Sequence, residues 1–142
     1  MTLLASGIIL FRLLEGVPHL LLLRHSQGKH WGFAKGRRDP ADAHEIATAR
    51  REVEEETGYT DVKLNPMFRS LLHYSVRDEI GDSIPKRVAY FLGPAPERDP
   101  ALSEEHDAFC WATEEEAEKL LGPENLQALA KAAFLQIVGE TS

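Results

Sequence analysis

The sequence predicts an α/β fold in which helices cover a mixed β-sheet. Residues 19–24 read HLLLLR, a continuous apolar run typical of a strand buried on both faces. Residues 43–57 instead repeat apolar side chains at Ile46, Ala49 and Val53, the spacing of an amphipathic helix. Strand-like segments stand on both sides of this helix in the chain, and two more helical segments follow them. This order favours one mixed sheet with helices packed against it.

Turn residues and apolar patterns divide the rest of the chain into short elements. Strands are predicted at residues 5–12, 19–24, 30–33, 86–92 and 108–112, with further strand material across 62–76 that is broken at Asn65-Pro66. Loops are predicted around Gly36 (34–38) and across the polar segment 77–85. One helix begins after Thr113, which has Glu116 at the capping-box distance, and ends at 120–123. A last amphipathic helix spans 124–138.

The composition is that of an ordinary globular protein. The chain has 142 residues, 43% apolar and 27% charged, and we expect a single domain over residues 1–142. No apolar run reaches the roughly 18 residues of a membrane span, so no membrane contact is expected. The single cysteine, Cys110, fits a reducing compartment, so a cytoplasmic protein is expected. The net charge of −7 argues against binding a nucleic-acid polymer. No heptad or apolar stripe demands a partner, so we expect a monomer.

Three glutamates on the predicted helix carry the strongest functional signal. Residues 51–59 read REVEEETGY and place Glu52, Glu55 and Glu56 at i, i+3 and i+4, on one helix face. Like charges at this spacing destabilise an isolated helix by roughly 0.2–0.5 kcal/mol per pair, so stability does not explain the pattern. A divalent cation would reverse the sign of that interaction, and carboxylate ligands suit Mg²⁺ or Mn²⁺. The alternative is an ordinary solvated acidic face.

The surroundings of the three glutamates favour the metal interpretation. Residues 34–38 read AKGRR and form a glycine-containing loop before the helix, while Gly58 stands at a natural C-cap position after it. A glycine loop that leads into an acidic helix can bind phosphates and a metal together.

These motifs resemble the signature of the Nudix hydrolases, G-x5-E-x7-R-E-U-x-E-E-x-G-U, in which U is a bulky apolar residue. The second half of the signature matches fully: Arg51, Glu52, Val53, Glu55, Glu56, Gly58 and Tyr59. The first half departs, because the sixth residue after Gly36 is Asp42 instead of glutamate and one extra residue follows it. Asp42 also begins a D-x-x-E capping pattern with Glu45, and we favour that capping role over a chemical one.

Segments outside the signature resemble the asymmetric diadenosine tetraphosphate hydrolases of the Nudix family. They occur in the same order along most of the chain: ASGIILFR (5–12), HWGFAKG (30–36), LHY (72–74), KRVAYFLG (86–93) and LSEEH (102–106). The resemblance implies an α/β/α sandwich with a central mixed sheet. It further implies a small dinucleoside polyphosphate as substrate, hydrolysis of diadenosine tetraphosphate to ATP and AMP, and Mg²⁺ or Mn²⁺ as cofactor.

Two tyrosines in these segments are candidates for stacking on a purine base. Tyr74 and Tyr90 both offer aromatic faces. Tyr90 alternates with Val88 and Leu92, however, and is equally well explained as part of the sheet core.

Basic side chains in the same segments are candidates for binding the polyphosphate. Lys35, Lys86 and His30 are predicted to contact it. Arg87 follows Lys86 directly, but a solvated charge at the sheet edge is an equal alternative for Arg87.

The resemblance also implies the catalytic roles. The predicted metal ligands are Glu52, Glu55, Glu56, Glu105 and a backbone carbonyl at Lys35 or Gly36. Glu105, or one of the helix glutamates, is expected to accept the proton of the attacking water. Arg51 is expected to pair with the acids and orient them, without touching substrate.

Two other functions stay open at this point. A Nudix pyrophosphohydrolase acting on nucleoside triphosphates or RNA 5′ ends would use the same glutamates, and its products would distinguish it. A degenerate Nudix module that binds nucleotides without turnover is compatible with Asp42 and the extra residue. The intact set of Glu52, Glu55 and Glu56 argues against the degenerate module.

Overall fold

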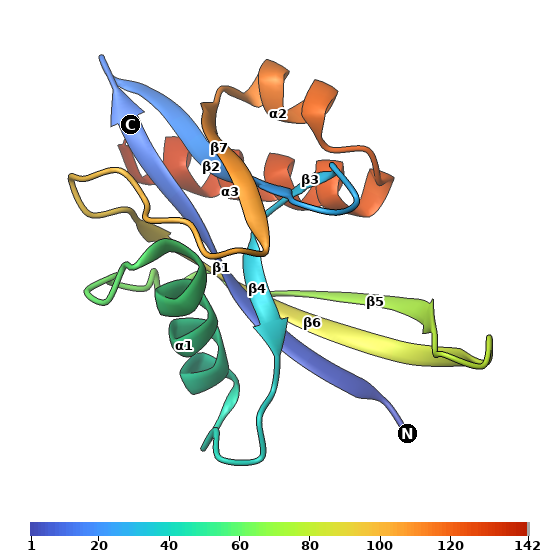
Figure 1. Ribbon diagram of the computed structural model, residues 1–142. Coiled ribbons are helices and arrows are strands. Elements are labelled where there is room, and N and C mark those ends of the chain that lie inside the picture. The colour runs from blue at the N-terminus through green and yellow to red at the C-terminus, as the bar shows by residue number, and fades with distance from the viewer. Residues whose placement is uncertain (142) are drawn as a thin grey trace.

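The computed structural model describes residues 1–141, which form a seven-stranded sheet with three helices around it (Figure 1). The elements, in chain order, are β1 (Leu3–Leu14), β2 (Val17–His25), β3 (Trp31–Gly32), β4 (Ala34–Arg37), α1 (Glu45–Thr57), β5 (Ser70–Arg77), β6 (Ser83–Pro94), β7 (His106–Ala112), α2 (Glu114–Leu120) and α3 (Glu124–Thr141).

Strand β1 organises the sheet. It runs parallel to β6 along most of its length and antiparallel to two strands on its other side, so the predicted mixed sheet is confirmed. Residues 5–8 of β1 pair with β4, whereas residues 11–14 pair with β2. Strand β2 then continues away from β1 and pairs with β7 and β3. The sheet therefore opens between β4 and the far part of β2.

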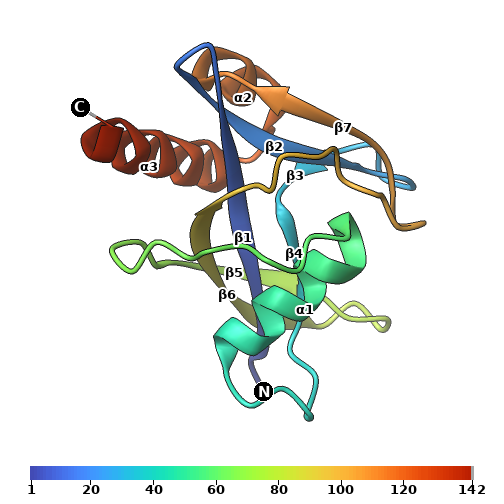
Figure 2. The ribbon, with the colours of Figure 1, turned by 90° about the vertical axis from the view of Figure 1, so that its left-hand side faces the viewer.

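Alternate side chains of the central strands enter two separate hydrophobic cores. Leu20 and Leu22 of β2 belong to the core under α2 and α3, whereas Leu21 and Leu23 belong to the core under α1. All four are buried, which confirms that this apolar run is covered on both faces. Figure 2 shows α1 and α3 on opposite sides of the strands. The three layers match the predicted α/β/α sandwich.

Helix α1 has a capping residue at each end, but its N-cap is not the residue that the sequence predicted. The N-cap is His44, whose Nδ1 accepts a hydrogen bond of 3.1 Å from the Ala47 amide, so the prediction that Asp42 caps the helix is wrong. Asp42 instead turns toward the helix and accepts from the Thr48 hydroxyl. At the other end, Gly58 adopts the left-handed conformation with φ 78°, as predicted for a C-cap glycine.

Several predicted element boundaries require correction. Residues 34–37, predicted as a loop, form strand β4, because β1 offers them a free edge to pair with. Residues 62–69 form no strand, and the polar segment 83–85 extends β6 in a tight hairpin with β5. The capping box of Thr113 and Glu116 at the start of α2 is confirmed. Among residues 1–141, no helix has both the length and the apolarity that crossing a bilayer requires.

Candidate active site

A cavity of about 760 Å³ opens where β4 and β2 diverge. It is bounded by α1, by β4 and β6, by the start of β7, and by the start of α3. Nine of the predicted site residues line it: His30, Lys35, Gly36, Glu52, Glu56, Tyr74, Lys86, Tyr90 and Glu105. Arg51 and Glu55 do not line it. The fold thus gathers into one place residues that are far apart in the sequence.

The outer edge of β4 forms one wall of the site. Strand β4 pairs with β1 on one side, and side chains of α1 satisfy the backbone groups on the other. The Lys35 amide donates to Glu56 Oε1 at 3.1 Å, and Arg51 Nη2 donates to the Arg37 carbonyl at 2.9 Å. Because the amide and carbonyl of one strand residue point to the same side, the Lys35 carbonyl lies on the Glu56 side of β4. Of the two predicted carbonyls, that of Lys35 is therefore the better placed.

Gly36 makes room for the carboxylate of Glu52. A Cβ atom on Gly36 would lie 2.0 Å from Glu52 Oε2 and 1.9 Å from its Cδ, closer than any real contact. The carboxylate therefore rests directly on the glycine Cα. This close approach gives the glycine of the signature a physical role that does not depend on loop flexibility.

Arg51 holds the acidic face of α1 together from behind. Its guanidinium donates to Glu52 at 3.0 Å, to Glu55 at 3.2 Å, and to both carboxylate oxygens of Asp42 at 3.0 and 3.1 Å. These hydrogen bonds from Arg51 keep the pKa of Asp42 well below its usual range. Asp42 is thus the anchor for Arg51, a role that neither the capping nor the chemical interpretation anticipated.

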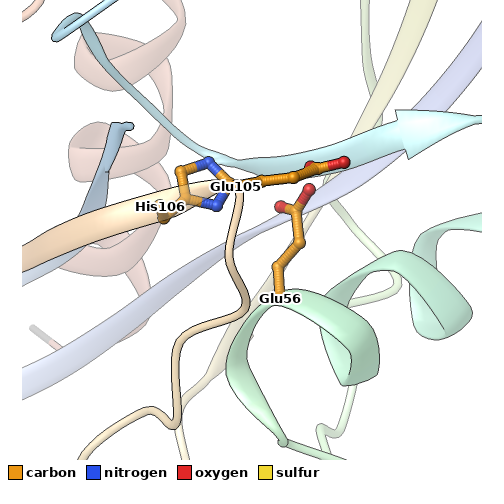
Figure 3. Close-up of side chains that lie close together, drawn as sticks. All are labelled: Glu56, Glu105 and His106. Carbon is orange, nitrogen blue, oxygen red and sulfur yellow. The ribbon is translucent and has the colours of Figure 1, made fainter. Parts of the chain in front are cut away.

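Glu56, Glu105 and His106 converge at the base of the cavity (Figure 3). One ligand atom from each of these residues lies within 4.8 Å of the others, so the group could hold a metal ion. Figure 3 shows the Glu56 carboxylate, from α1, pointing toward the carboxylate of Glu105, the residue directly before β7. His106 Nδ1 is buried and has no hydrogen-bond partner among residues 1–141.

Burial makes the negative charge of this group unfavourable without a cation. Glu56 is only 3% exposed, and burial, with Glu52 and Glu105 nearby, raises its pKa to about 8. Burial also raises the pKa of Glu52, to which the charge of Glu55 contributes. Acids with raised pKa values in a cleft are typical of functional sites.

Cations line the same cavity. Lys35, Arg37 and Lys86 come from β4 and β6, and none of them forms an ion pair within residues 1–141. Burial lowers the pKa of Lys86 to about 8, and the charges of Lys35 and Arg37 add to that effect. The Lys86 ammonium lies 5.9 Å from the centre of the Tyr74 ring, a cation–π contact.

Tyr90 is part of the hydrophobic core and does not present a free face on which a purine could stack. It is 1% exposed, belongs to the same core as Val88 and Leu92, and packs edge to face against Phe33. Its aromatic faces are therefore covered, and the prediction that a purine stacks on Tyr90 is wrong. Tyr74 is only partly buried and keeps that role available.

Arg87 lies outside the cavity altogether. Successive strand residues point to opposite faces, so Lys86 enters the cavity while Arg87 faces the α1 side of the sheet. The interpretation of Arg87 as a polyphosphate ligand of this cavity is wrong.

Sequence reasoning missed several residues of the cavity. His25 stacks on His30 with ring centres 5.0 Å apart and meets the edge of His106 at 5.8 Å. Arg37 also lines it, as do Pro123, directly before α3, and Asn125 and Leu126 in the first turn of α3. Arg37 could have been predicted from its two-residue spacing from Lys35, because residues i and i+2 of a strand lie on the same face. The residues around the start of α3 carried no local signal.

Comparison with known proteins identifies the family. The NUDIX domain profile matches residues 1–132, which is most of the chain. The chain belongs to the Nudix family. The resemblance inferred from the signature is therefore confirmed, and the glutamates on α1, Arg51 and Gly36 are residues of the Nudix signature.

The similar proteins within this family agree with one another. The chain is 37% identical over 139 residues to the asymmetrical bis(5′-nucleosyl)-tetraphosphatase of Rattus norvegicus, covering 90% of each chain. It is 36% identical over 128 residues to the Mus musculus protein of the same name, covering 82% and 83%. A crystal structure of a binary complex of the C. elegans Ap4A hydrolase superposes with a TM-score of 0.87 at 28% identity, covering 96% of this chain and 98% of that chain.

Proposed function

We propose that this Nudix protein hydrolyses dinucleoside polyphosphates in a reaction that requires Mg²⁺ or Mn²⁺, splitting diadenosine tetraphosphate into ATP and AMP. The observation that carries the proposal is a single cavity lined by both carboxylates (Glu52, Glu56 and Glu105) and cations (Lys35, Arg37 and Lys86). Relatives at 36–37% identity that carry the name of this activity support it. The cavity volume of about 760 Å³ lies within the range of nucleotide-sized sites.

The carboxylates of the cavity fit a divalent cation. Glu52, Glu56, Glu105 and the Lys35 carbonyl would hold it, with Glu55 at the outer rim of the group. The raised pKa of Glu56 and the unpartnered His106 nitrogen mark a site with unmet interactions. When bound, the cation would supply charge neutralisation for phosphate oxygens and acidify a water molecule.

The chain's own groups would then position the substrate and move one proton. Lys35, Arg37 and Lys86 would bind the phosphates that the cation does not reach, since phosphoryl transfer needs positioning and charge neutralisation above all. Glu105 is the exposed carboxylate of the group, and it would accept the proton of the attacking water. Arg51 would fix the orientation of Glu52 from outside the cavity.

The rim of the cavity would receive a nucleoside. Tyr74 offers a partly exposed ring, and His30 is exposed beside the stacked ring of His25. Such flat surfaces bind bases by stacking. The single cysteine supports a cytoplasmic setting, and we propose that the protein acts there as a monomer.

The test is an assay of purified protein with diadenosine tetraphosphate and Mg²⁺, in which anion-exchange chromatography separates the products. Equal amounts of ATP and AMP are expected. Glu56→Gln should abolish most turnover, whereas Glu54→Gln, on the exposed side of the same helix, should retain it. If only a nucleoside triphosphate or a capped RNA fragment is cleaved, dinucleoside polyphosphates are not the substrate class of this enzyme. No turnover of any of these substrates would favour a Nudix module that binds nucleotides without hydrolysing them.

A further inference from the structure

A second groove lies on the other side of the sheet from the catalytic cavity. Its volume is about 270 Å³, and it shares no lining residue with the catalytic cavity. Strands β1, β5 and β6 form its floor, and the segment from β4 into α1 forms its wall. The lining residues are Leu4, Ala5, Ser6, Arg38, Ala43, His44, Glu45, Leu71, Arg87 and Ala89.

Strand register explains why the two sites are separate. In the parallel pair of β1 and β6, Leu3 is opposite Lys86 and Leu4 is opposite Arg87. Because neighbouring strand residues face opposite sides, Lys86 enters the catalytic cavity and Arg87 enters the groove. The two adjacent basic residues therefore serve different surfaces.

The groove carries an excess of positive charge. Within residues 1–141, Arg38 and Arg87 form no ion pair, although both line the groove. The one acid of the groove, Glu45, is already bound by the Arg69 guanidinium, whose Nη2 donates at 2.8 Å. Hydrogen bonds from Arg69 lower the pKa of Glu45, and the charges of Arg87 and Arg38 contribute. Three guanidinium groups, those of Arg38, Arg69 and Arg87, thus share one carboxylate, in a protein with a net charge of −7.

Two further groups in the groove are suited to an anion. The groove includes the start of α1, where the amides of Glu45 and Ile46 precede the first intrahelical hydrogen bonds. Ser6 is only 3% exposed and lines the groove, so its hydroxyl is a further hydrogen-bond donor there. A hydroxyl, helix amides and paired guanidinium groups are the donors that phosphate prefers.

We propose that this groove binds a phosphate group, as free inorganic phosphate or as the phosphate of a mononucleotide. Arg38 and Arg87 supply the charge, the start of α1 supplies amides, and Ser6 supplies a hydroxyl. The apolar floor of Leu4 and Leu71 leaves space for part of a ribose or base. The site is independent of the hydrolytic reaction proposed above.

The experiment is an NMR titration of the ¹⁵N-labelled protein, kept free of divalent metal by EDTA, with inorganic phosphate. We expect the amide signals of Ser6, Arg38, Glu45 and Ile46 to shift together along one binding curve. Arg87→Gln should raise the Kd of that curve by at least about tenfold, the usual effect of losing one charge-assisted hydrogen bond. Ser6→Ala should raise it by a smaller factor. Lys86→Gln, the adjacent residue on the opposite face, is the matched control and should leave it unchanged.

Parallel titrations with AMP and with adenosine distinguish the possible ligands. Tighter binding of AMP than of phosphate, with added shifts at Leu71, would assign the groove to a mononucleotide; equal binding would assign it to phosphate alone. The proposal is overturned if the groove amides do not respond, or if adenosine binds as well as AMP. It is also overturned if Lys86→Gln abolishes the response while Arg87→Gln preserves it. Unchanged far-ultraviolet circular dichroism confirms that each variant is folded.

Discussion

Replacing Glu56 by glutamine should separate the electrostatic role of this buried acid from its role in folding. Glu56 is 3% exposed, and burial raises its pKa to about 8 from an ordinary value of 4.5. Between these two values, the folded protein holds a proton that the unfolded chain releases. The free energy of unfolding must therefore fall as the pH rises through this window. Glutamine retains an oxygen that can accept from the Lys35 amide but carries no charge.

The magnitude follows from the shift. Each pH unit inside the window costs roughly 1.4 kcal/mol, or about 4 kcal/mol between pH 5 and pH 8. The stability of metal-free wild-type protein should decrease over this range, while that of Glu56→Gln should stay nearly flat. The variant should thus be the more stable protein at pH 8 and lose most turnover.

Urea denaturation at several pH values in EDTA measures this difference. Adding Mg²⁺ should remove the pH dependence of the wild type, because a cation favours the ionised carboxylate, and should not affect Glu56→Gln. Glu54→Gln is the control and should follow the wild type throughout. Parallel stability curves for wild type and Glu56→Gln in EDTA would refute the reasoning.

Three other perturbations test the same geometry. Gly36→Ala should weaken Mn²⁺ binding at least about tenfold, because the added Cβ would displace the Glu52 carboxylate. Calorimetry measures this, and the control is Gly32→Ala, whose added Cβ meets nothing within 4 Å and which should bind Mn²⁺ like the wild type. Tyr90→Ala should destabilise the protein by about 3–5 kcal/mol in urea, as removal of a fully buried ring does, and a change in KM alone would contradict its place in the core. The KM for substrate should rise as Lys86 loses its proton above about pH 8, and Lys86→Arg should move that rise to higher pH; an unshifted profile would exclude Lys86.

Local sequence patterns predicted most elements, because each depends on the order of side chains along a few turns or one strand. The apolar run of β2, the stripe of α1 and the capping box of α2 all appear where expected. The failures have a common cause. Strand β4 is a strand because β1 offers it an edge, and residues 62–69 lack such a partner in spite of their apolar content. Pairing between distant segments cannot be read from either segment alone.

The part of the candidate site that lies on helix α1 was predictable from the sequence. The spacing of Glu52, Glu55 and Glu56 fixed their common face before any contact was known. The partner of Arg51 was not predictable, since Asp42 reaches it only after the chain turns out of β4. His25 was also missed, because only the pairing of β2 with β7 brings its ring to that of His106.

The sequence by itself determined the fold class, the acidic face of α1 and the family, because periodicity and motif spacing are local properties. Tertiary structure decided which side of the sheet each residue serves. It buried Tyr90, joined Glu56 to Glu105, and sent Lys86 and Arg87 to opposite faces. Burial and the approach of distant charges set pKa values and affinities, and both arise only when the layers of the sandwich close on the sheet.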